Sequence, residues 1–445
     1  MQVPAEEARD ELLEELSDDA LVDRVQRQTF RYFWDFAHPT SGLTRERRFM
    51  PGRSTDLVAT GASGFGAMAI LVGVERGWIG RDEALHRLLA MLRHLEHAQC
   101  YHGVFPHWLN GRTGATIPFN RKDDGADLVE TSYLMQGLLC ARQYFGGTGA
   151  ESELRERINR LWRETEWSWH TQGNRHVLYW HWSPNHGWSI DYEIRGWNEC
   201  LITYVLAASA PRYAIDADAY HRGWASGRDF RNGRTFYDIE LPLGPDFGGP
   251  LCFAHYSFLG LDPRGLRDRY ADYWRQNVNH VLINRQHCVR NPHRFKGYGA
   301  DCWGLTSDDS DTGYRELSPT SDFGVIAPNA ALASFPYTPD HSMEALRHFY
   351  DVMRAQIWGE YGFTSAFCEE REWFSDDHIG IDQGPIVIMI ENHRSGLLWK
   401  LFMSCPEVQA GLRRLGFESP YLEPGRHTLV GEKRRQQAAA DDVAP

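Results

Sequence analysis

The sequence predicts an all-α protein, an (α/α)6 barrel in which six outer helices surround six inner ones, with loop hairpins at the barrel mouth. About twelve segments carry apolar residues at helical spacing. Segments that are apolar on nearly every side, as buried helices are, alternate loosely with charged amphipathic segments. The connections are rich in Gly, Pro and Trp. The sequence shows no crisp repeat, so the prediction depends on the alternation.

The first half of the chain shows the alternation in order. Asp19–Phe36 is amphipathic, Asp56–Arg76 is small and apolar, and Arg81–Ala98 is amphipathic again. The pattern recurs with an apolar segment at Ala126–Phe145 and a charged one at Ala150–Trp169. An inner helix followed by an outer one is therefore expected twice.

The second half is less regular but predicts helices of the same two kinds. Glu193–Ser209 is apolar and predicts another inner helix. The remaining helices are predicted at Phe247–Leu259, Gly265–Leu282, Asp322–Ala333, Ser342–Gln356, Gly384–Met403 and Pro406–Arg414. Two strand-like runs, Arg175–Trp182 and Thr235–Leu241, predict the loop hairpins. Residues 1–18 are interpreted as an acidic extension, 19–423 as one barrel domain, and 424–445 as a disordered polar tail.

Composition narrows the class of partner. The net charge of −13 argues against nucleic acid, because phosphate binding needs clustered Lys and Arg. It suits a neutral substrate that carboxylates act on. The chain also holds 16 Trp, 19 Tyr and 22 Phe, more rings than a core of this size needs. Such rings can stack on sugars, although a ring-rich core is the alternative for each of them. A dinucleotide-binding pattern is weak, and we expect no cofactor.

Cysteine usage and the N-terminus bear on metal binding and location. The eight cysteines are widely spaced, lack a Cys-x-x-Cys pattern, and are expected to be buried thiols rather than disulfides or zinc ligands. No apolar run is long enough to span a bilayer, and no membrane partner is expected. The first 25 residues lack the features of a signal peptide. This predicts a cytoplasmic protein, or a periplasmic one if a signal has been removed. The sequence leaves the oligomeric state open.

The first group of candidate catalytic acids opens the apolar segment at residue 126. Asp127 and Glu130, three residues apart, share a helix face, and Asp123 lies just before them. Capping of the helix by these acids is the alternative, about even with function for each residue singly. The apolar helix that follows favours a cavity at this terminus, and therefore function for at least one acid.

The second candidate is Glu199, in the run Arg195-Gly-Trp197-Asn-Glu199. It opens a segment that is otherwise hydrophobic on every side. Burial of an unpaired carboxyl raises its pKa, and a carboxyl kept protonated near neutrality can act as a general acid. The alternative is a salt bridge to Arg195, four residues earlier.

Two further stretches supply candidates. The loop Gly297–Tyr314, with Tyr298, Asp301 and Trp303, is predicted to form an active-site wall in which Trp303 is a stacking platform. Acids at 308, 309 and 311 make a calcium loop the rival, but the spacing lacks a closing Glu, and no metal site is predicted. Asp382 lies two residues before Gly384-Pro385, a predicted helix entrance.

Three more features complete the set. Glu391–Arg394, a polar interruption of the last apolar helix, is expected to be a buried network. Trp188 belongs to a tryptophan-rich loop in which sugar stacking competes with ordinary packing. His107 lies in the run Gly103–Trp108 and is a candidate substrate-binding residue.

Several of these runs together resemble one family. The segments Asp56–Ile79, Gly103–Trp108, Asp123–Gln136, Gly196–Glu199, Gly297–Tyr314 and Ile379–Trp399 occur in the order found in the glucoamylase-like helical-barrel family. That family includes endo-β-1,2-glucanases, sophorose-releasing enzymes and the transglycosylating domain of cyclic β-1,2-glucan synthases. The resemblance covers most of residues 20–420.

The resemblance implies an (α/α)6 fold and hydrolysis of β-1,2-glucan or its oligosaccharides. It implies Glu199 as general acid and a second carboxylate among Asp127, Asp123 and Asp382, with Asp382 placed slightly behind the other two. Trp197, Arg195, Glu130, Trp303, Tyr298, Asp301, Trp188 and His107 are the candidate substrate-binding residues. A retaining transglycosylase, a hydrolase of another glycan and a non-catalytic sugar-binding barrel are the alternatives.

Overall fold

The computed structural model describes residues 16–49 and 55–423. Within these ranges the structure is helical, and its strands are short. The predicted disordered tail, 424–445, and residues 1–15 of the predicted extension lie outside the described residues. The first helix, α1 (Asp18–Trp34), begins where Ser17 accepts a hydrogen bond from the Ala20 backbone N–H.

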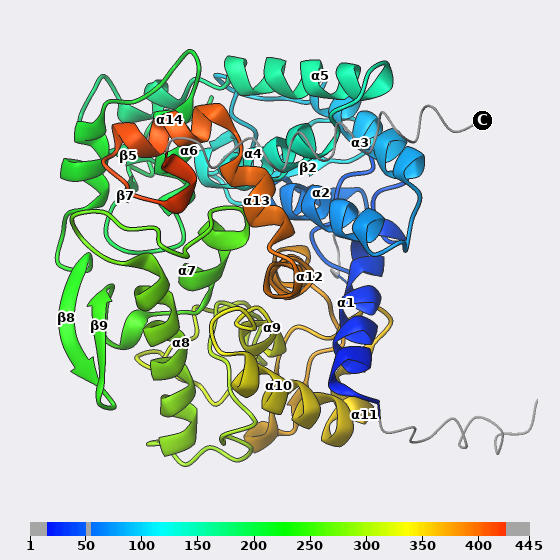
Figure 1. The fold of residues 1–445 in the computed structure, drawn as a ribbon, viewed down its shortest axis with the longest axis vertical. Helices are drawn as coiled ribbons and strands as arrows, with labels where there is room; N and C mark the ends of the chain where they lie inside the picture. Colours follow the sequence, from blue (N-terminus) through cyan, green and yellow to red (C-terminus); the bar gives the residue numbers. More distant parts are fainter. Residues whose placement is uncertain (1–15, 50–54, 424–445) are drawn as a thin grey trace, which may run out of the picture.

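Four long or strongly apolar helices form the interior: α2 (Thr60–Glu75), α4 (Leu128–Tyr144), α6 (Leu201–Ser209) and α12 (Gly380–Arg394). α2 packs between α4 and α12, and α4 also packs on α6. Figure 1 shows α12 near the centre of the molecule, between α2 and α9 (Pro328–Leu332). The shorter α7 (Cys252–His255) and the 3-10 turn η4 (Tyr256–Leu259) are also buried, and η4 packs on α6 and α12.

Glycines bring α2 and α4 into backbone contact. A Cβ atom on Gly64 would lie 2.1 Å from the carbonyl oxygen of Tyr133, and one on Gly137 would lie 2.0 Å from that of Gly64. Neither position can take a side chain without separating the helices. The close approach fixes the beginnings of α2 and α4 relative to each other, and both helices contribute to the site described below.

The amphipathic helices surround this interior. They are α1, α3 (Arg81–Leu95), α5 (Ala150–Glu164), α8 (Tyr273–Arg290), α10 (Pro339–Arg347) and α14 (Pro406–Arg414). In α5 the buried face is an apolar stripe of Leu154, Ile158, Leu161 and Trp162. In α8 the buried face also holds polar residues such as His280 and Asn284. The predicted all-α class and most predicted helices are therefore observed, and α14 has the predicted bounds.

Several helix predictions need correction. The helix predicted at Asp322–Ala333 begins only at Pro328, and Phe247–Leu259 is broken into short turns. The segment predicted as a helix from Glu193 is first a strand, β7 (Glu193–Ile194), and then turns at Gly196, with φ of +80°, before α6 begins at Leu201. α8 begins at Tyr273 rather than Gly265, because the Asp272 side chain accepts a hydrogen bond from the Arg275 backbone N–H. The helix predicted from Gly384 begins at Gly380, which places Asp382 in its first turn.

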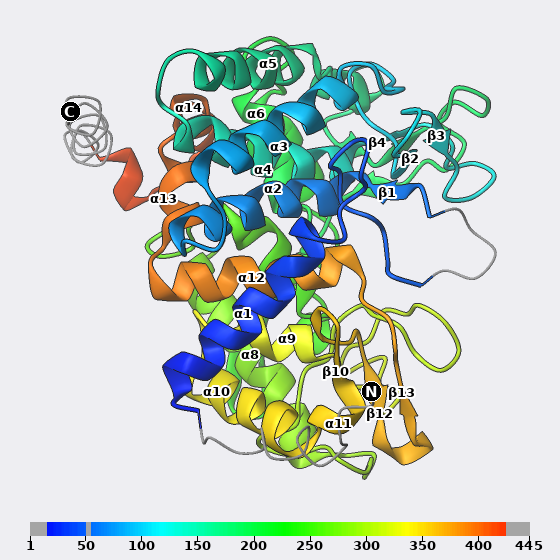
Figure 2. The ribbon, with the colours of Figure 1, turned by 90° about the vertical axis from the view of Figure 1, so that its right-hand side faces the viewer.

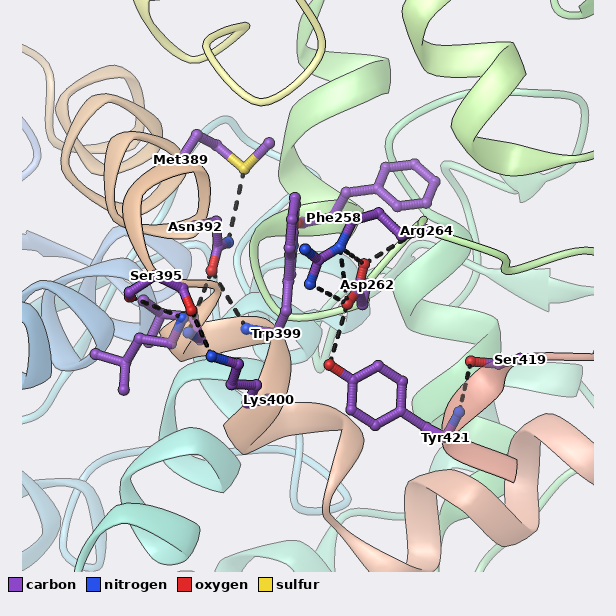
Figure 3. A network of polar contacts seen from close by, with 12 residues as sticks. Phe258, Asp262, Arg264, Met389, Asn392, Ser395, Trp399, Lys400, Ser419 and Tyr421 are labelled. Atoms are coloured by element: carbon purple, nitrogen blue, oxygen red, sulfur yellow. Dashed lines mark hydrogen bonds and ion pairs between the residues drawn. The ribbon is translucent and has the colours of Figure 1, made fainter. Parts of the chain in front are cut away.

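That last helix also ends early. Gly396, with φ of +67°, separates α12 from α13 (Leu397–Met403). At the bend, Asn392 donates to the carbonyl of Leu259 (2.9 Å), and its Oδ1 accepts from the backbone N–H of Leu398 and of Trp399. Figure 3 shows this network, which joins α12 and α13 to η4. The predicted buried network at Glu391–Arg394 is thus present at Glu391 and Asn392, whereas His393 and Arg394 are exposed.

Short strands gather on one side of the molecule (right in Figure 2). There β1 (Leu57–Ala59) and β4 (Ala126–Asp127) run directly into α2 and α4. The run predicted as a hairpin at Arg175–Trp182 instead contributes β5 (Leu178–Tyr179) and β6 (His181–Trp182), which pair with β7 and β4.

The other predicted hairpin is observed and lies elsewhere. It consists of β8 (Arg231–Phe236) and β9 (Ile239–Leu243), and β9 packs on α8. In the part of the chain that the structure describes, no helix is long and apolar enough to cross a membrane. Seven of the eight cysteines are buried, and Cys100 is exposed.

Candidate active site

The beginning of α4 gathers the first predicted acids around two histidines. Asp127 caps the helix: its Oδ1 accepts hydrogen bonds from the backbone N–H groups of Val129 (3.0 Å) and Glu130 (2.9 Å). Its Oδ2 lies 3.1 Å from Nδ1 of His107. Burial raises the pKa of a carboxyl, but the hydrogen bond from His107 and the nearby histidine charges lower that of Asp127.

His107 is the cation of this cluster. Burial lowers the pKa of an imidazole, yet Glu130 and Asp127 outweigh it and raise the pKa of His107 to about 10. Oε2 of Glu130 accepts a hydrogen bond from the backbone N–H of Gly61, at 2.7 Å, from the first turn of α2. Burial raises the pKa of Glu130 to about 7.

Asp123 adds a further carboxyl to the same cluster. Its Oδ2 lies 3.4 Å from Nε2 of His181, which is also 3.7 Å from Oδ2 of Asp127. The pairing of β4 with β6 places His181 there, since Asp127 and His181 are register partners. Burial and the negative charge of Asp127 raise the pKa of Asp123 to about 7.

Glu199 lies two residues before α6, on an inner wall of the molecule. The Oγ of Ser257 donates to its backbone carbonyl at 2.5 Å and fixes its position. The alternative of a salt bridge to Arg195 is not observed, because Arg195 pairs with Glu193. Among the described residues, no side chain forms a hydrogen bond or an ion pair with the Glu199 carboxyl. Burial and the negative charge of Glu316 raise its pKa to about 7.

A second acidic cluster surrounds the beginning of α12. Asp382 is fully buried; Tyr256 donates to its Oδ1 at 3.3 Å, and its Oδ2 has no hydrogen-bond partner among the described residues. Burial and the neighbouring charge of Asp308 raise the pKa of Asp382 well above its usual range. Arg47 lies near both acids, but it forms ion pairs with Asp309 (2.9 Å) and Asp377 (3.4 Å).

Three tyrosines lie between Glu199 and the second cluster. The hydroxyl of Tyr133 is buried without a hydrogen-bond partner among the described residues. Burial raises its pKa first, and the charges of Glu199 and Glu130 add to this. Tyr256 and Tyr314 lie in the field of Asp382, which together with burial raises the pKa of each. The Tyr133 hydroxyl and Oδ2 of Asp382, both without a hydrogen-bond partner among the described residues, can bind hydroxyl groups of a sugar.

An aromatic wall joins Glu199 to the α4 cluster. The Trp180 ring stacks on His181 (centroids 5.6 Å apart, planes at 13°) and meets Tyr192 edge to face at 5.7 Å. Tyr192 is 53% exposed. Burial of its hydroxyl is the main cause that raises the pKa of Tyr192, and the negative charges of Glu199 and Glu316 raise that pKa further. A ring face beside a protonated carboxyl suits the binding of a sugar.

Several predicted binding residues are corrected by their burial. Trp303 is fully buried and Trp197 is 2% exposed; both pack in the core, so neither offers a ring face to a ligand. Tyr298 donates to Asp322 (2.7 Å), and Asp301 pairs with His348, which follows the surrounding helix α10. Of the loop Gly297–Tyr314, only the second part, which holds Asp308 and Tyr314, therefore lies beside the candidate site.

Trp188 and Arg195 are placed beside the site rather than in it. Trp188 packs against His170 and Tyr179, in the same loop region. Arg195 is exposed. Sequence reasoning missed the tyrosines at 133, 192, 256 and 314, Trp180, His181 and Glu316. The sequence signal that could have indicated Tyr133 and Tyr256 was a polar hydroxyl group inside a segment that is otherwise apolar.

Comparisons with known proteins now identify the family. A family model described as "Putative glucoamylase" matches residues 191–406. A putative glucoamylase from Bacteroides uniformis is 54% identical, with 92% of this chain and 100% of that chain covered and a TM-score of 0.90. The chain belongs to the glucoamylase-like family. The resemblance stated from the sequence is confirmed.

Other members of the glucoamylase-like family carry functional names. An endo-β-1,2-glucanase from Chitinophaga pinensis, in a complex with sophorotriose and glucose, is 52% identical; 92% of this chain and 100% of that chain are covered, and the TM-score is 0.90. An exo β-1,2-glucooligosaccharide sophorohydrolase from Parabacteroides distasonis is 46% identical over 422 residues, 90% of this chain. The chain spans 58% of that relative's length.

Proposed function

We propose that the protein hydrolyses β-1,2-glucosidic bonds in β-1,2-glucan or its oligosaccharides. The observation that carries the proposal is Glu199: a desolvated carboxyl, with no side-chain partner among the described residues and a pKa of about 7, in a family whose members include β-1,2-glucan hydrolases. A general acid must hold its proton near neutrality and still reach the leaving oxygen. Glu199 meets the first requirement by burial, and its half-buried position meets the second.

We assign the second carboxyl to Asp382 rather than to Asp127 or Asp123. Both oxygens of Asp127 already accept hydrogen bonds or an ion pair, and Asp123 faces His181. Oδ2 of Asp382 has no partner among the described residues and can take a proton from water. Burial and the charge of Asp308 raise its pKa, which makes it a stronger base once it has given up its own proton.

In the proposed reaction, Glu199 donates its proton to the leaving glucosyl oxygen while Asp382 removes a proton from the attacking water. Attack from the face opposite the leaving group inverts the anomeric configuration. The Trp180–Tyr192 wall and Tyr133 hold the sugar beside Glu199. We also infer that the alternating buried and amphipathic helices form an (α/α)6 barrel, with the site at the end where α2, α4, α6 and α12 begin.

The test is a reducing-sugar assay on a panel of glucans that includes linear β-1,2-glucan. Glu199→Gln should lower kcat roughly 10²–10⁴-fold while the far-UV circular dichroism is unchanged. Glu193→Gln is the matched control, because Glu193 lies on the same segment and pairs with Arg195. Near-normal turnover of β-1,2-glucan by Glu199→Gln contradicts the assignment, and activity on another glucan alone contradicts the substrate.

The product anomer tests the role of the second carboxyl. Proton NMR of the first product formed should show the anomer opposite to that of the β-linkage. A retained configuration would remove Asp382 as a base for water and favour a covalent intermediate.

A further inference from the structure

Three metal-ligating side chains converge at the base of the loop Gly297–Tyr314, away from the acids described above. Cys302 belongs to the loop, His348 follows α10, and Glu369 follows strand β12 (Phe367–Cys368). One ligand atom from each residue lies within 4.8 Å of the other two. Segments far apart in the sequence therefore present sulfur, nitrogen and oxygen to one small space.

The atoms that face this space lack other partners. Cys302 is 1% exposed, and Nε2 of His348 is buried without a hydrogen-bond partner among the described residues. The same ranges of the chain offer no hydrogen bond or ion pair to the Cys302 thiol or to the Glu369 carboxyl. Buried polar atoms without a partner are costly, and each such atom in a folded protein calls for an explanation, such as an ion.

The surroundings orient these side chains. Nδ1 of His348 lies 3.2 Å from Oδ2 of Asp301, and a carboxylate on the second ring nitrogen is the usual support of a metal-bound histidine. Gly297, with φ of +89°, leaves room for the carboxyl: a Cβ atom there would lie 2.2 Å from Oε1 of Glu369. The glycine thus preserves the position of the third ligand atom.

A comparison with another cluster shows why this one is distinctive. His287, His293 and Asp322 also lie within ligand distance of each other. There, however, Nε2 of His287 contacts Asp322 directly at 2.8 Å, and Tyr237 and Tyr298 occupy the other ring nitrogen of His287 and the other carboxylate oxygen of Asp322. Two of its three side chains are therefore already paired, whereas Nε2 of His348 in the Cys302 cluster has no partner among the described residues.

We propose that Cys302, His348 and Glu369 bind one Zn²⁺ ion. Zinc accepts this mixture of sulfur, nitrogen and oxygen ligands in a tetrahedral arrangement, at distances of about 2.0–2.3 Å. A small inward movement of the three side chains closes that geometry around the ion, and water completes it. The ion fastens the base of the loop whose far part brings Asp308 and Tyr314 to the candidate active site. The proposal does not depend on which glycan the protein cleaves.

The first experiment measures metal content. Protein loaded with Zn²⁺ and passed through a desalting column should retain about one zinc per chain by mass spectrometry. Loading with Co²⁺ should give a thiolate-to-cobalt charge-transfer band, which needs a cysteine ligand and so excludes the other histidine–acid clusters. Retention well below one zinc per chain, or cobalt binding without the thiolate band, overturns the proposal.

Variants locate the ion. Cys302→Ser and Glu369→Gln should each lose the retained zinc, and His293→Ala is the matched control that keeps it. Zinc at a hundredfold excess over its Kd should raise the Tm of the wild-type chain by about 3 °C and leave the Tm of Glu369→Gln unchanged. Equal zinc retention by Glu369→Gln and wild type overturns the assignment, even if Cys302→Ser does not fold.

Discussion

The two acidic clusters of the site neutralise their charge in different ways. At the beginning of α4, Asp127 is held by two backbone N–H groups and by His107, whose pKa of about 10 makes it a cation. At the beginning of α12, Asp382 and Asp308 are both fully buried, and the nearby Arg47 pairs with other acids. In the α4 cluster, hydrogen bonds and a cation stabilise the carboxylate of Asp127. In the α12 cluster, Oδ2 of Asp382 has no partner among the described residues, so a proton or a ligand would stabilise it.

This difference separates acids that position from acids that react. A carboxylate that accepts several hydrogen bonds is stabilised as an anion and is a weak base. A carboxyl that is buried beside another acid costs stability, and such costs persist where they serve function. We therefore expect substitutions in the two clusters to affect activity and stability in opposite proportions.

The largest effect is expected for Asp382→Asn. Loss of the base should lower kcat on β-1,2-glucan roughly 10³-fold. The Tm should stay the same or rise, because an uncharged amide replaces a carboxyl that burial and Asp308 already disfavour as an anion. Steady-state kinetics and calorimetry measure the two quantities. The control is Asp311→Asn, which breaks an ion pair between Asp311 of the loop Gly297–Tyr314 and Arg371. A large fall in Tm with modest loss of kcat would reverse the comparison.

The α4 cluster should behave in the opposite way. Asp127→Ala removes a helix cap and leaves His107 without its ion pair, so the free energy of unfolding should fall by roughly 2–4 kcal/mol. Urea denaturation measures this. Asp127→Asn keeps a capping oxygen and should recover part of the loss. If both variants unfold at the wild-type urea concentration, the cap does not hold this end of α4.

The pH dependence of stability sharpens the comparison through Glu199. Its pKa is raised from 4.5 to about 7 in the folded protein, so the folded state holds the proton more tightly. The stabilisation is complete below the unfolded value and is lost as the pH rises from about 4.5 to about 7. Glu199→Gln should therefore unfold like the wild type near pH 4.5 and be more stable by roughly 1–2 kcal/mol near pH 8. If the difference in unfolding free energy between Glu199→Gln and the wild type is the same at pH 4.5 and at pH 8, Glu199 is not desolvated.

The sequence predicted the helices better than it predicted the site. Periodicity locates α1, α3, α5 and α14 because each has one buried face. It fails at Glu193–Cys200, where an apolar run forms a strand and a turn that only tertiary pairing with Leu178–Tyr179 explains. It correctly marked Glu199 as a carboxyl without a local partner.

The aromatic residues show the limit more clearly. Trp303 and Trp197 look like loop residues available for stacking, yet both are buried. Trp180 and Tyr192, which form the wall beside Glu199, are separated by the strand connection and meet only when β5 pairs with β7. Burial of a ring depends on contacts between distant segments, which the local pattern does not contain.

The smallest effect should come from this wall, which links the two kinds of acid. Trp180→Ala removes the ring that stacks on His181 and faces the space beside Glu199. We expect KM for β-1,2-glucan to rise about tenfold, the equivalent of about 1.4 kcal/mol of lost ring contact, with kcat little changed. Trp169→Ala is the matched control: Trp169 is 39% exposed and stacks on His102 instead. An equal rise in KM for both variants would show a general loss of loop packing, whereas a fall in kcat for Trp180→Ala alone would mean that His181 and the α4 cluster take part in the reaction itself.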